Sequence, residues 1–583
     1  MNLNKKVACP LDCYDTCQAE LIEDNIKGSK ENIVTNGKLC VNFANLLKEE
    51  NIEVPSFEGK NISLEESLNI LVDKLKSTTP AKTLYYKGSG NLGVMQGVTK
   101  RFFAEHKAVL ASGSLCDEAG DAGITEGRGA NLCLSPLHVK DAEVVILWGR
   151  NPSVTNSHML PSLKGKTLIV IDPVKIDLAL NAALHIQIKP RGDLYLALLL
   201  CRLVAMEEME DQTFLQERTL NYKDYLEFIN GIPMRKLLDK SHVNLDEVGE
   251  LLHLVKGKKV SILVGIGVQK YSFGHSVLRA IDAFGAMLGL FGKKGCGVGY
   301  LSNSGFGFTS PFKVNAKTEP LPIVNFGKYD LVFIQGGNPL NQMPCTSKVK
   351  EGLHKAKCVV YFGLHENETS SKADLVIPAL SFLEKEDLKL SYGHPFIGRM
   401  PKLVDGKGGI SEYALTQALL SSFSYEALAS EESIIEGVIA SNSSEKDGFL
   451  ISKTYEEYPY EKTFYTKSGK FEFLEEFDDD FDDEEGFFLI AAKQNKSLNS
   501  QFVTDDYLYV PLCLGLEQEE RVRLTNRYGS AEYSVMPSDK LRDDCLLLYS
   551  GAKNANQLTP YAMSQEGNCA TYQEMKVKLE KVQ

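Results

Sequence analysis

Runs of Val, Ile, Leu and Phe without alternating polar residues recur along the chain, and each ends in Gly, Asn, Asp or Pro. Two examples are VVILW followed by GRNP (144–152) and LVFIQ followed by GGNP (331–339). Uninterrupted apolar runs are typical of strands that are buried on both faces, as in a parallel sheet covered by helices. The pattern therefore predicts an α/β protein whose strands end in glycine-containing turns.

The strand pattern occurs twice in the same order, which indicates an internal duplication. One half contains DAEVVILWGRNP, TLIVIDP, ALHIQIKP and KVSILVGIGV, and the other contains KYDLVFIQGGNP, CVVYFG, ADLVIP and KTLYYKGSGN; these lie at 141–152, 167–173, 183–190, 259–268, 328–339, 358–363, 373–378 and 82–91. The strand at 82–91 precedes one whole half, and its companions follow residue 328. We therefore expect one domain to be inserted in the other.

The turns after these strands are candidate ligand cradles. In parallel sheets, ligands bind beyond the carboxyl ends of the strands, where glycines let backbone amides approach a phosphate. Asp172, which ends its strand, is positioned to accept hydrogen bonds from a ribose or a base. Turn chemistry alone is the alternative, because Gly, Asn and Pro end strands in many proteins. The candidates for diphosphate contact are Gly149, Asn151, Gly265, Gly267, Gly336, Gly337 and Asn338.

Four of the thirteen cysteines are clustered near the N-terminus. CPLDCYDTC places Cys9, Cys13 and Cys17 four residues apart, and Cys40 follows later. Three closely spaced thiolates and one distant thiolate can surround an iron–sulfur cluster. A zinc site is the competing metal hypothesis, although zinc sites usually present two C-x2-C pairs, and structural thiols are the third. The other nine cysteines are scattered singly and are expected in cores.

Composition and charge narrow the function classes. A chain of 583 residues favours several domains, and a net charge of −13 argues against nucleic acid as a partner, because phosphate binding needs a basic surface. No segment has the length and apolarity of a membrane span, and the N-terminal residues lack an apolar signal segment. The expected location is the cytoplasm.

Taken together, the motifs resemble the molybdopterin oxidoreductase superfamily of the dimethyl sulfoxide reductase type, over almost the entire chain. The motifs are, in order, CPLDCYDTC with GKLC, VVILWGRNP, LIVIDP, KPRGD, LVGIGVQK, HSVLRAIDAFGAMLGLFGKKGCGVG, VFIQGGNPLNQMP, FGLHENETSSKADLVIPALSFLEKEDL, KSGKFEF, NRYGS and NANQLTPYAMSQEGNCATYQEMKVKLEKV. No single string carries the resemblance, but their order does.

The resemblance implies an α/β multidomain fold with a small iron–sulfur domain, two αβα dinucleotide-binding-like domains and a C-terminal barrel of the double-psi type that covers the pterins. The expected boundaries are 1–58 for the iron–sulfur domain, 59–135 and 327–485 for the two parts of the outer αβα domain, 136–326 for the inserted αβα domain, and 486–583 for the barrel.

The resemblance also implies the cofactors, namely a 4Fe-4S cluster and molybdenum or tungsten held by two pterin guanine dinucleotides. A protein side chain often supplies a further metal ligand, and the loop ASGSLCDEAGDAG (111–123) makes Cys116 the candidate, since a thiolate suits a sulfur-rich metal shell. Ser114 is a weaker alternative ligand. Asp117 or Glu118 can handle protons beside the metal.

Further positions follow from the resemblance alone. Asp193 in KPRGD matches an acidic group for a guanine, and His365 and Thr369 in LHENETS match pterin contacts. Asn499 and Ser500 in KSLNSQF and Asn556 in NANQLT match contacts from the barrel side.

The sequence departs from the family at several points. Cys40 is followed by Val41 and Asn42, where the family usually has lysine and glycine, so the cationic residue between cluster and pterin is missing. The segment before NRYGS is short, and the acidic run at 475–486 is expected to be a solvated loop.

The expected activity is a two-electron redox step on a small molecule, by oxygen-atom transfer or by hydride or proton transfer, with electrons passing singly through the cluster. Asp117 follows Cys116, where formate-oxidising relatives typically have histidine, which weakens formate as the substrate. Sulfur oxyanions, nitrate, sulfoxides and a non-redox hydration stay open. The implied protein partner is ferredoxin-like, a flavoprotein or quinone-linked.

Two other classes of function stay open as well. In the first, the chain holds cluster and pterin without turnover, as an electron-transfer or assembly subunit. In the second, it is a nucleotide-binding protein or transferase whose four N-terminal cysteines bind zinc.

Overall fold

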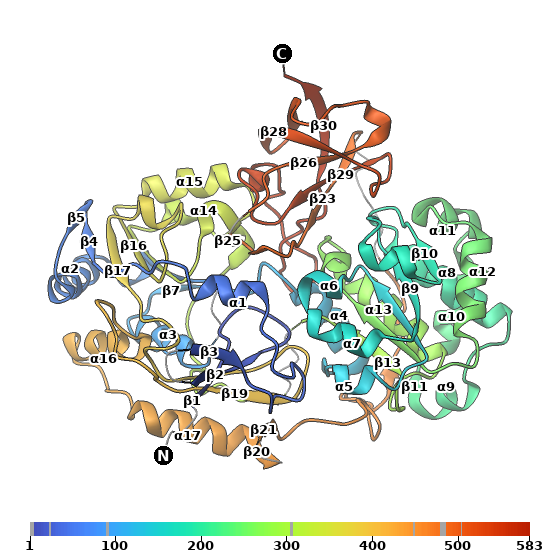
Figure 1. Cartoon of the computed structure of the whole chain (residues 1–583), viewed down its shortest axis with the longest axis horizontal. Helices are drawn as coiled ribbons and strands as arrows, with labels where there is room; N and C mark the ends of the chain where they lie inside the picture. The colour runs from blue at the N-terminus through green and yellow to red at the C-terminus, as the bar shows by residue number, and fades with distance from the viewer. Residues whose placement is uncertain are drawn as a thin grey trace.

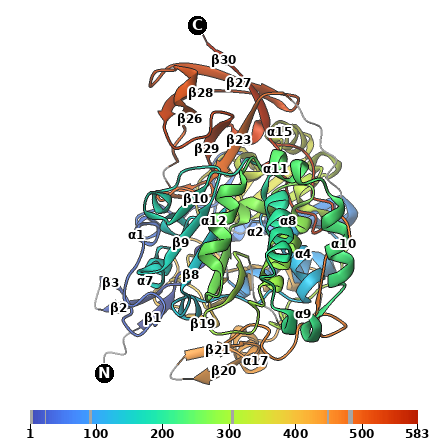
Figure 2. The same ribbon diagram turned by 90° about the vertical axis from the view of Figure 1, so that its right-hand side faces the viewer.

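The computed structural model describes residues 5–22, 25–88, 93–302, 307–446, 449–477, 485–502 and 504–582. Two α/β lobes lie side by side, a small N-terminal sheet lies between them at one end, and a β-barrel lies at the other end with the C-terminus (Figures 1 and 2). Part of the glycine-rich turn expected at 88–91 and most of the acidic run expected as a solvated loop lie outside the described residues.

A five-stranded parallel sheet, here called the inner sheet, forms the core of one lobe, and every strand pair in it is parallel. Its spatial order is β10 (Leu184–Ile186), β9 (Thr167–Ile171), β8 (Val144–Trp148), β12 (Val260–Val264) and β13 (Gly297–Tyr300).

The other lobe contains an eight-stranded sheet, here called the outer sheet. Its first six strands pair in parallel, whereas β4 and β5 continue it as an antiparallel hairpin. The order is β14 (Thr318–Pro320), β7 (Val109–Ser112), β6 (Thr83–Lys87), β15 (Leu331–Gln335), β16 (Cys358–Gly363), β17 (Leu375–Pro378), β4 (Ser56–Phe57) and β5 (Lys60–Asn61).

The duplication expected from the sequence is confirmed by the strand order. The inner order β10-β9-β8-β12-β13 matches the outer order β17-β16-β15-β6-β7 strand for strand. In the outer sheet, β6 and β7 precede the whole inner sheet in the chain, so one sheet is interrupted by the other. The domain boundaries themselves stay predictions; β4 and β5, on either side of residue 58, both belong to the outer sheet.

Both faces of each central strand are buried, which explains the uninterrupted apolar runs. In β8, Val144, Ile146 and Trp148 pack into one core and Val145 and Leu147 into another. The residues of β15 divide between two cores in the same alternating way. The helices that fill these cores include α8 (Asp193–Met206), α12 (Leu245–Val255) and α13 (Gly274–Met287) on the inner sheet, and α2 (Leu64–Ser77), α3 (Thr99–Glu105), α15 (Thr346–Lys355) and α16 (Glu412–Ser422) on the outer sheet.

The smaller elements surround these lobes. They are the helices α4 (Glu118–Arg128), α5 (Pro136–Val139), α6 (Pro152–Thr155), α7 (Leu160–Leu163), α9 (Gln212–Arg218), α10 (Tyr222–Gly231), α11 (Met234–Ser241), α14 (Pro339–Gln342) and α17 (Glu431–Asn442), and the strand pairs β11 (Thr219–Leu220) with β22 (Phe471–Glu472) and β24 (Ser497–Leu498) with β25 (Gln501–Phe502).

The N-terminal region forms an antiparallel three-stranded sheet and one short helix. A second antiparallel sheet, from the far side of the outer lobe, packs against it through β19. The elements are β1 (Lys5–Ala8), β2 (Gln18–Ile22), β3 (Asn25–Gly28) and α1 (Val41–Leu46), followed by the order β18 (Asp387–Lys389), β19 (Phe396–Met400), β21 (Phe449–Ser452) and β20 (Ser443–Lys446).

The C-terminal segment closes into a six-stranded barrel, which together with the two lobes confirms the expected mixed α/β multidomain fold. The barrel order is β23 (Phe487–Ala492), β29 (Cys545–Tyr549), β26 (Leu508–Pro511), β28 (Gly529–Ser538), β27 (Arg521–Asn526) and β30 (Lys576–Lys581). Among the described residues, no helix combines the length and apolarity that crossing a membrane requires.

Candidate functional site

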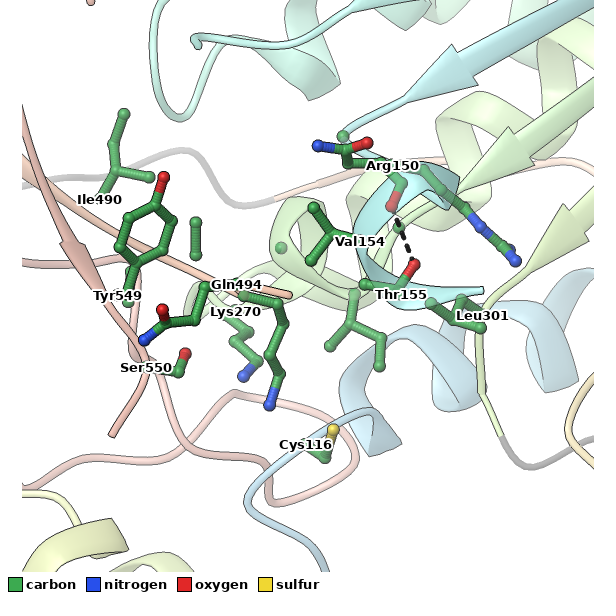
Figure 3. Close-up of a pocket in the computed structure, with 18 of the residues that line it drawn as sticks. Cys116, Arg150, Val154, Thr155, Lys270, Leu301, Ile490, Gln494, Tyr549 and Ser550 are labelled. Carbon is green, nitrogen blue, oxygen red and sulfur yellow. Dashed lines mark hydrogen bonds between the residues drawn. The ribbon is translucent and has the colours of Figure 1, made fainter. Parts of the chain in front are cut away.

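A cavity of about 1100 Å³ lies where the N-terminal region, the carboxyl ends of the inner strands and the barrel meet. Figure 3 shows Cys116, Lys270 and Gln494 on its wall, contributed by three segments far apart in the chain. Cavities that bind drug-sized ligands are typically about 300–1000 Å³ in volume. This cavity is therefore large enough for a large organic cofactor.

The four N-terminal cysteines all line this cavity. The loop that carries three of them, residues 9–17 and here called the cysteine loop, is closed by a hydrogen bond from the Cys9 amide to the Cys17 carbonyl at 2.7 Å. Cys40 comes directly before α1 and packs in the same hydrophobic cluster as Cys9 and Cys17. The structure thus brings together all four predicted cluster ligands.

Burial sets the pKa values of the thiols on the cysteine loop. Burial raises the pKa of Cys9 to about 12 and raises the pKa of Cys13 and Cys17 above their usual range, and each thiolate raises the pKa of its neighbours further. Among the described residues, no three His, Cys, Asp or Glu side chains are grouped closely enough to hold one metal ion.

Cys116 lies on the loop between β7 and α4 and lines the same cavity. Its amide donates a hydrogen bond to Ser114 Oγ at 2.8 Å, and Ser114 Oγ donates to Asp117 Oδ1 at 3.0 Å. Gln269 Nε2 donates to the Cys116 carbonyl at 2.8 Å, which ties this loop to the inner sheet. Because the Ser114 hydroxyl is engaged on both sides, Cys116 is the stronger candidate ligand.

Charged groups from several elements surround Cys116. Burial raises the pKa of its thiol to about 12 and Asp117 adds to the shift, while Lys270 and Lys493 oppose it. Burial also raises the pKa of Glu118 to about 7, with Asp117 adding to that shift as well. Glu118 therefore gives this end of the cavity a group that can take up or release a proton near neutral pH.

Asp121 extends the carboxylate group one turn into α4. Its Oδ1 accepts hydrogen bonds from Ser302 Oγ at 2.6 Å and from Asn131 Nδ2 at 2.8 Å. Burial nevertheless raises the pKa of Asp121 to about 6. Nothing in the sequence distinguishes Asp121, because a single Asp inside a helix belongs to no motif.

The inner cradle consists of residues 149–151 and 265–267, and all of these residues line the large cavity. Gly149 has a φ of +58°, and its amide donates to the Ile171 carbonyl at 2.7 Å. A Cβ on Gly265 would lie 1.8 Å from the Gly149 carbonyl oxygen. Glycine is thus required at both turns for the strands to end side by side.

Two predicted aspartates line the cavity beside the inner cradle. Asp172 Oδ1 accepts a hydrogen bond from the Val174 amide at 2.8 Å, and Asp193 Oδ1 accepts one from Trp148 Nε1 at 2.7 Å. Burial raises the pKa of Asp172 to about 7 and that of Asp193 to about 6. Hydrogen-bond donors of a ligand would favour the ionised carboxylates, as expected for contacts to a guanine or a ribose.

The outer cradle, residues 336–338 with Gly88, repeats the backbone of the inner cradle. Gly336 has a φ of +55°, and its amide donates to the Phe362 carbonyl at 2.8 Å. A Cβ on Gly88 would lie 2.4 Å from the Gly336 carbonyl oxygen. This cradle lines a separate pocket of only about 90 Å³, which also contains His365 and Ser500.

The predicted side chains of the outer cradle bond mainly to one another. Asn338 Nδ2 donates to Glu368 Oε2 at 2.6 Å and to Ser500 Oγ at 3.3 Å, and Asn338 Oδ1 accepts from Thr369 Oγ1 at 2.9 Å. Thr369 is fully buried, so it supports Asn338 and does not face the pocket. His365 Nε2 lies 3.4 Å from Glu49 Oε2.

Two predicted barrel-side residues line neither cavity. Asn499 accepts a hydrogen bond from Lys493, which does line the large cavity. Asn556 Nδ2 donates to the Asn341 carbonyl at 2.6 Å and so joins the barrel to α14. Both residues therefore support the walls in this structure.

Several cavity residues were missed from the sequence. Lys270 follows the inner cradle, and Lys493 follows β23. Arg150 Cζ lies 4.8 Å from the centroid of the Tyr14 ring. Lys270 is the last residue of the LVGIGVQK motif, so the sequence contained a signal for it. Lys493 belongs to no motif, and only the position of the barrel identifies it as a cavity residue.

Comparison with protein families gives a match over the middle of the chain. The model described as molybdopterin oxidoreductase matches residues 60–413, which is more than half of the chain.

Two curated relatives and one solved structure extend the similarity beyond that segment. The probable oxidoreductase YyaE of Bacillus subtilis is 27% identical over 80% of this chain and 77% of its own length, and the probable oxidoreductase YoaE of the same organism is 24% identical over 99% and 98%. The structure of acetylene hydratase from Pelobacter acetylenicus aligns with a TM-score of 0.79 at 15% identity, covering 99% of this chain and 100% of that one. At this identity the structural likeness shows a shared fold.

Proposed function

The chain belongs to the molybdopterin oxidoreductase family, an enzyme family that uses a molybdenum or tungsten pterin cofactor, and we propose that it holds this metal between two pterin guanine dinucleotides. We further propose that a 4Fe-4S cluster on Cys9, Cys13, Cys17 and Cys40 passes electrons singly to or from that centre. The reaction is a two-electron redox step on a small substrate.

The observation that carries the proposal is a single cavity lined by the four N-terminal cysteines, Cys116 and the inner cradle. These groups come from opposite ends of the first half of the chain. Electron transfer between two centres needs them near one another, and one shared cavity provides this proximity.

The residues fit the proposed groups. The inner cradle requires glycine, which has no side chain, because a Cβ on Gly265 would collide with the Gly149 carbonyl oxygen. The Gly149 and Gly265 amides already donate to backbone carbonyls, so what suits a diphosphate here is the absence of side chains at these turns, which permits close approach. The four N-terminal cysteines line one cavity, where a bound metal group would replace their thiol protons.

When bound, the metal–pterin centre supplies the two-electron chemistry. Cys116 supplies a thiolate directed into the cavity, and its loop is fixed by Gln269. Glu118, with a pKa of about 7, is suited to take up or release a proton beside that loop, and Asp117 is the second candidate for this role. Residues of the barrel, among them Ile490 and Tyr549, form one wall of the cavity.

The pterin arms are assigned to the two cradles. Gly149, Asn151, Gly265 and Gly267 hold one diphosphate, with Asp172 and Asp193 beside its nucleoside. Gly336, Gly337 and Asn338, with His365, Thr369 and Ser500 near them, are assigned to the second arm. The barrel, proposed to be of the double-psi type, covers both, with Asn499 and Asn556 as supports.

The electron balance implies a protein partner. A two-electron reaction inside the cavity and a one-electron cluster at its wall require a carrier that exchanges electrons one at a time, such as a ferredoxin-like protein, a flavoprotein or a quinone-linked protein. The substrate class stays open among nitrate, sulfur oxyanions and sulfoxides.

Metal and nucleotide analysis tests the proposal. The chain would be purified anaerobically from a host that makes the pterin dinucleotide, and iron, molybdenum, tungsten, zinc and guanine nucleotide would be counted per chain. We expect about four irons for one cluster, together with one molybdenum or tungsten and a pair of guanine nucleotides. Iron without molybdenum or tungsten would favour the electron-transfer subunit, and zinc without iron would contradict both.

Matched variants locate the two metals. Cys9→Ala is expected to lose iron, and Cys116→Ala is expected to keep iron while changing the X-ray absorption spectrum of the molybdenum or tungsten. Cys513→Ala removes an exposed cysteine outside the cavity and should change neither metal. Iron retained in full by Cys9→Ala would contradict the cluster assignment.

A further inference from the structure

A segment far along the chain, residues 389–394, packs closely over the cysteine loop. Ser391 Oγ donates to the Tyr14 carbonyl at 2.7 Å, and His394 Nε2 bonds to the Asp15 carbonyl at 2.7 Å. A Cβ on Gly393 would lie 1.8 Å from the Tyr14 ring. The fit is close enough that each side chain of this segment has a defined relation to the loop.

Lys389 at the end of β18 brings a buried ammonium into this contact. The residue is only 1% exposed. Its Nζ donates to the Leu11 carbonyl at 2.5 Å and lies 3.5 Å from the Pro10 carbonyl, both in the stretch between Cys9 and Cys13. An ammonium without a counter-charge is costly to bury, so the charge it balances needs to be identified.

Among the residues that the structure describes, no carboxylate forms an ion pair with Lys389. Lys385, four residues earlier and also buried, shows the contrast, because Glu412 Oε2 lies 2.7 Å from its Nζ. The acidic groups that face Lys389 are Cys9, Asp12, Cys13 and Asp387, whose negative charges all favour its charged form against the effect of burial, which lowers its pKa.

The two carboxylates in that set are already engaged elsewhere. Asp387 Oδ1 accepts from the Met95 amide at 2.8 Å, and burial raises the pKa of Asp387 to about 7. Asp12 accepts a hydrogen bond from the Tyr392 hydroxyl. When a cluster is bound, the thiolates of Cys9 and Cys13 add further negative charge that faces Lys389.

We propose that Lys389 is the fixed positive charge of the N-terminal cluster site, which stabilises the reduced cluster and so raises its reduction potential. The inference rests on the proposed function, since it needs a cluster on the four cysteines. On reduction, one electron enters from a one-electron donor, the cluster becomes more negative by one charge, and no bond forms or breaks. A buried cation beside the loop favours the more negative state, because the low dielectric strengthens the attraction.

The test is an anaerobic redox titration of the full-length holoprotein, with dithionite as the reductant and electron paramagnetic resonance of the reduced cluster as the readout. Lys389→Gln keeps a hydrogen-bond donor for the Leu11 carbonyl and removes the charge, whereas Lys389→Arg keeps the charge. We expect Lys389→Gln to shift the equilibrium at least about tenfold toward the oxidised cluster, or about 59 mV for one electron. Lys389→Arg should stay near the wild-type potential.

Lys402→Gln is the matched control, because Lys402 follows β19 of the same hairpin. The Lys402 side chain is 46% exposed and is paired with Asp405. Water and salt screen that charge, so the potential should not move. Equal potentials for wild type, Lys389→Gln and Lys389→Arg would overturn the proposal. Loss of iron from both Lys389 variants would also overturn it, by assigning Lys389 a purely structural role.

The outcome is distinguishable from failure of the proposed function. A wild-type chain without iron would contradict the cluster itself, before any variant is titrated. A wild-type chain with a cluster whose potential ignores residue 389 would contradict only the role of Lys389.

Discussion

The inner and outer cradles share a backbone and differ in their side chains. In both, the glycine after the central strand has a positive φ and donates to the carbonyl at the end of the neighbouring strand, and a glycine on the next strand touches its carbonyl oxygen. The inner cradle nevertheless lines a cavity of about 1100 Å³, and the outer cradle lines a pocket of about 90 Å³.

The asparagine that follows each glycine turn also differs in its partners. Asn338 is buried and bonded to Glu368, Thr369 and Ser500, whereas Asn151 is half-buried and accepts a hydrogen bond from Ser153. Duplication has thus preserved what the strands require, while the side chains around each turn have diverged. A ligand that contacts the Asn338 side chain must replace its hydrogen bonds to Glu368, Thr369 and Ser500, whereas one that contacts the Asn151 side chain must replace the bond from Ser153.

The largest expected effect tests the shared backbone. Gly265→Ala and Gly88→Ala should each destabilise the chain by about 3 kcal/mol, because the added methyl meets a backbone carbonyl that cannot move independently. Thermal unfolding of each variant measures the effect. Gly267→Ala is the control, since its Cβ would have 3.9 Å to the nearest atom. A harmless Gly265→Ala would show that the cradle is not built on this contact.

The next effect separates the two asparagines. Asn338→Ala should cost about 2 kcal/mol of stability, because the buried Thr369 hydroxyl and Glu368 lose their partner. Asn151→Ala should cost less stability but lower the guanine nucleotide content of the purified chain. Unfolding and nucleotide analysis of both variants check this, and equal losses of stability would contradict the difference between the cradles.

A pH effect is expected in the inner cavity. Asp193 has a pKa of about 6 in the folded chain against an ordinary value of 3.8, so the folded state binds more protons than the unfolded state between those values. The stability of the cofactor-free chain should therefore fall as the pH rises through that window. Asp193→Asn should flatten this dependence, as measured by melting temperature against pH. An unchanged slope would contradict the assigned burial of this carboxyl.

The smallest effect concerns Ser500 in the outer cradle. Its hydroxyl accepts from Asn338 at 3.3 Å, which is a long hydrogen bond. Ser500→Ala should therefore cost about 0.5 kcal/mol, visible as a small shift in melting temperature. A loss as large as that of Asn338→Ala would show that Ser500 carries much of the network.

The sequence predicted the parts of the structure that depend on local pattern. Apolar runs gave the parallel strands, and their repetition gave the duplicated order of β8 to β10 and β15 to β17. The order of motifs indicated the family, which the match over 60–413 confirms. These features follow from one stretch of chain at a time.

Features made by distant segments were not predictable in the same way. The bond between Asn338 and Ser500 joins the outer sheet to a loop near the barrel, and the bond from Lys389 to Leu11 joins opposite halves of the chain. The motifs around Asn338 and Lys389 do not predict that Ser500 and Leu11 are their partners. The cation expected directly after Cys40 is absent from the sequence, and only the structure brings Lys389 to the cysteine loop.

The central claim, that one cavity holds both metal centres, is tested most directly by anomalous X-ray diffraction from crystals of the anaerobically purified holoprotein, recorded at the iron edge and at the molybdenum or tungsten edge. The account predicts an iron peak among Cys9, Cys13, Cys17 and Cys40 and a separate molybdenum or tungsten peak beside Cys116. A heavy-metal peak away from Cys116, or no iron at the four cysteines, would contradict it.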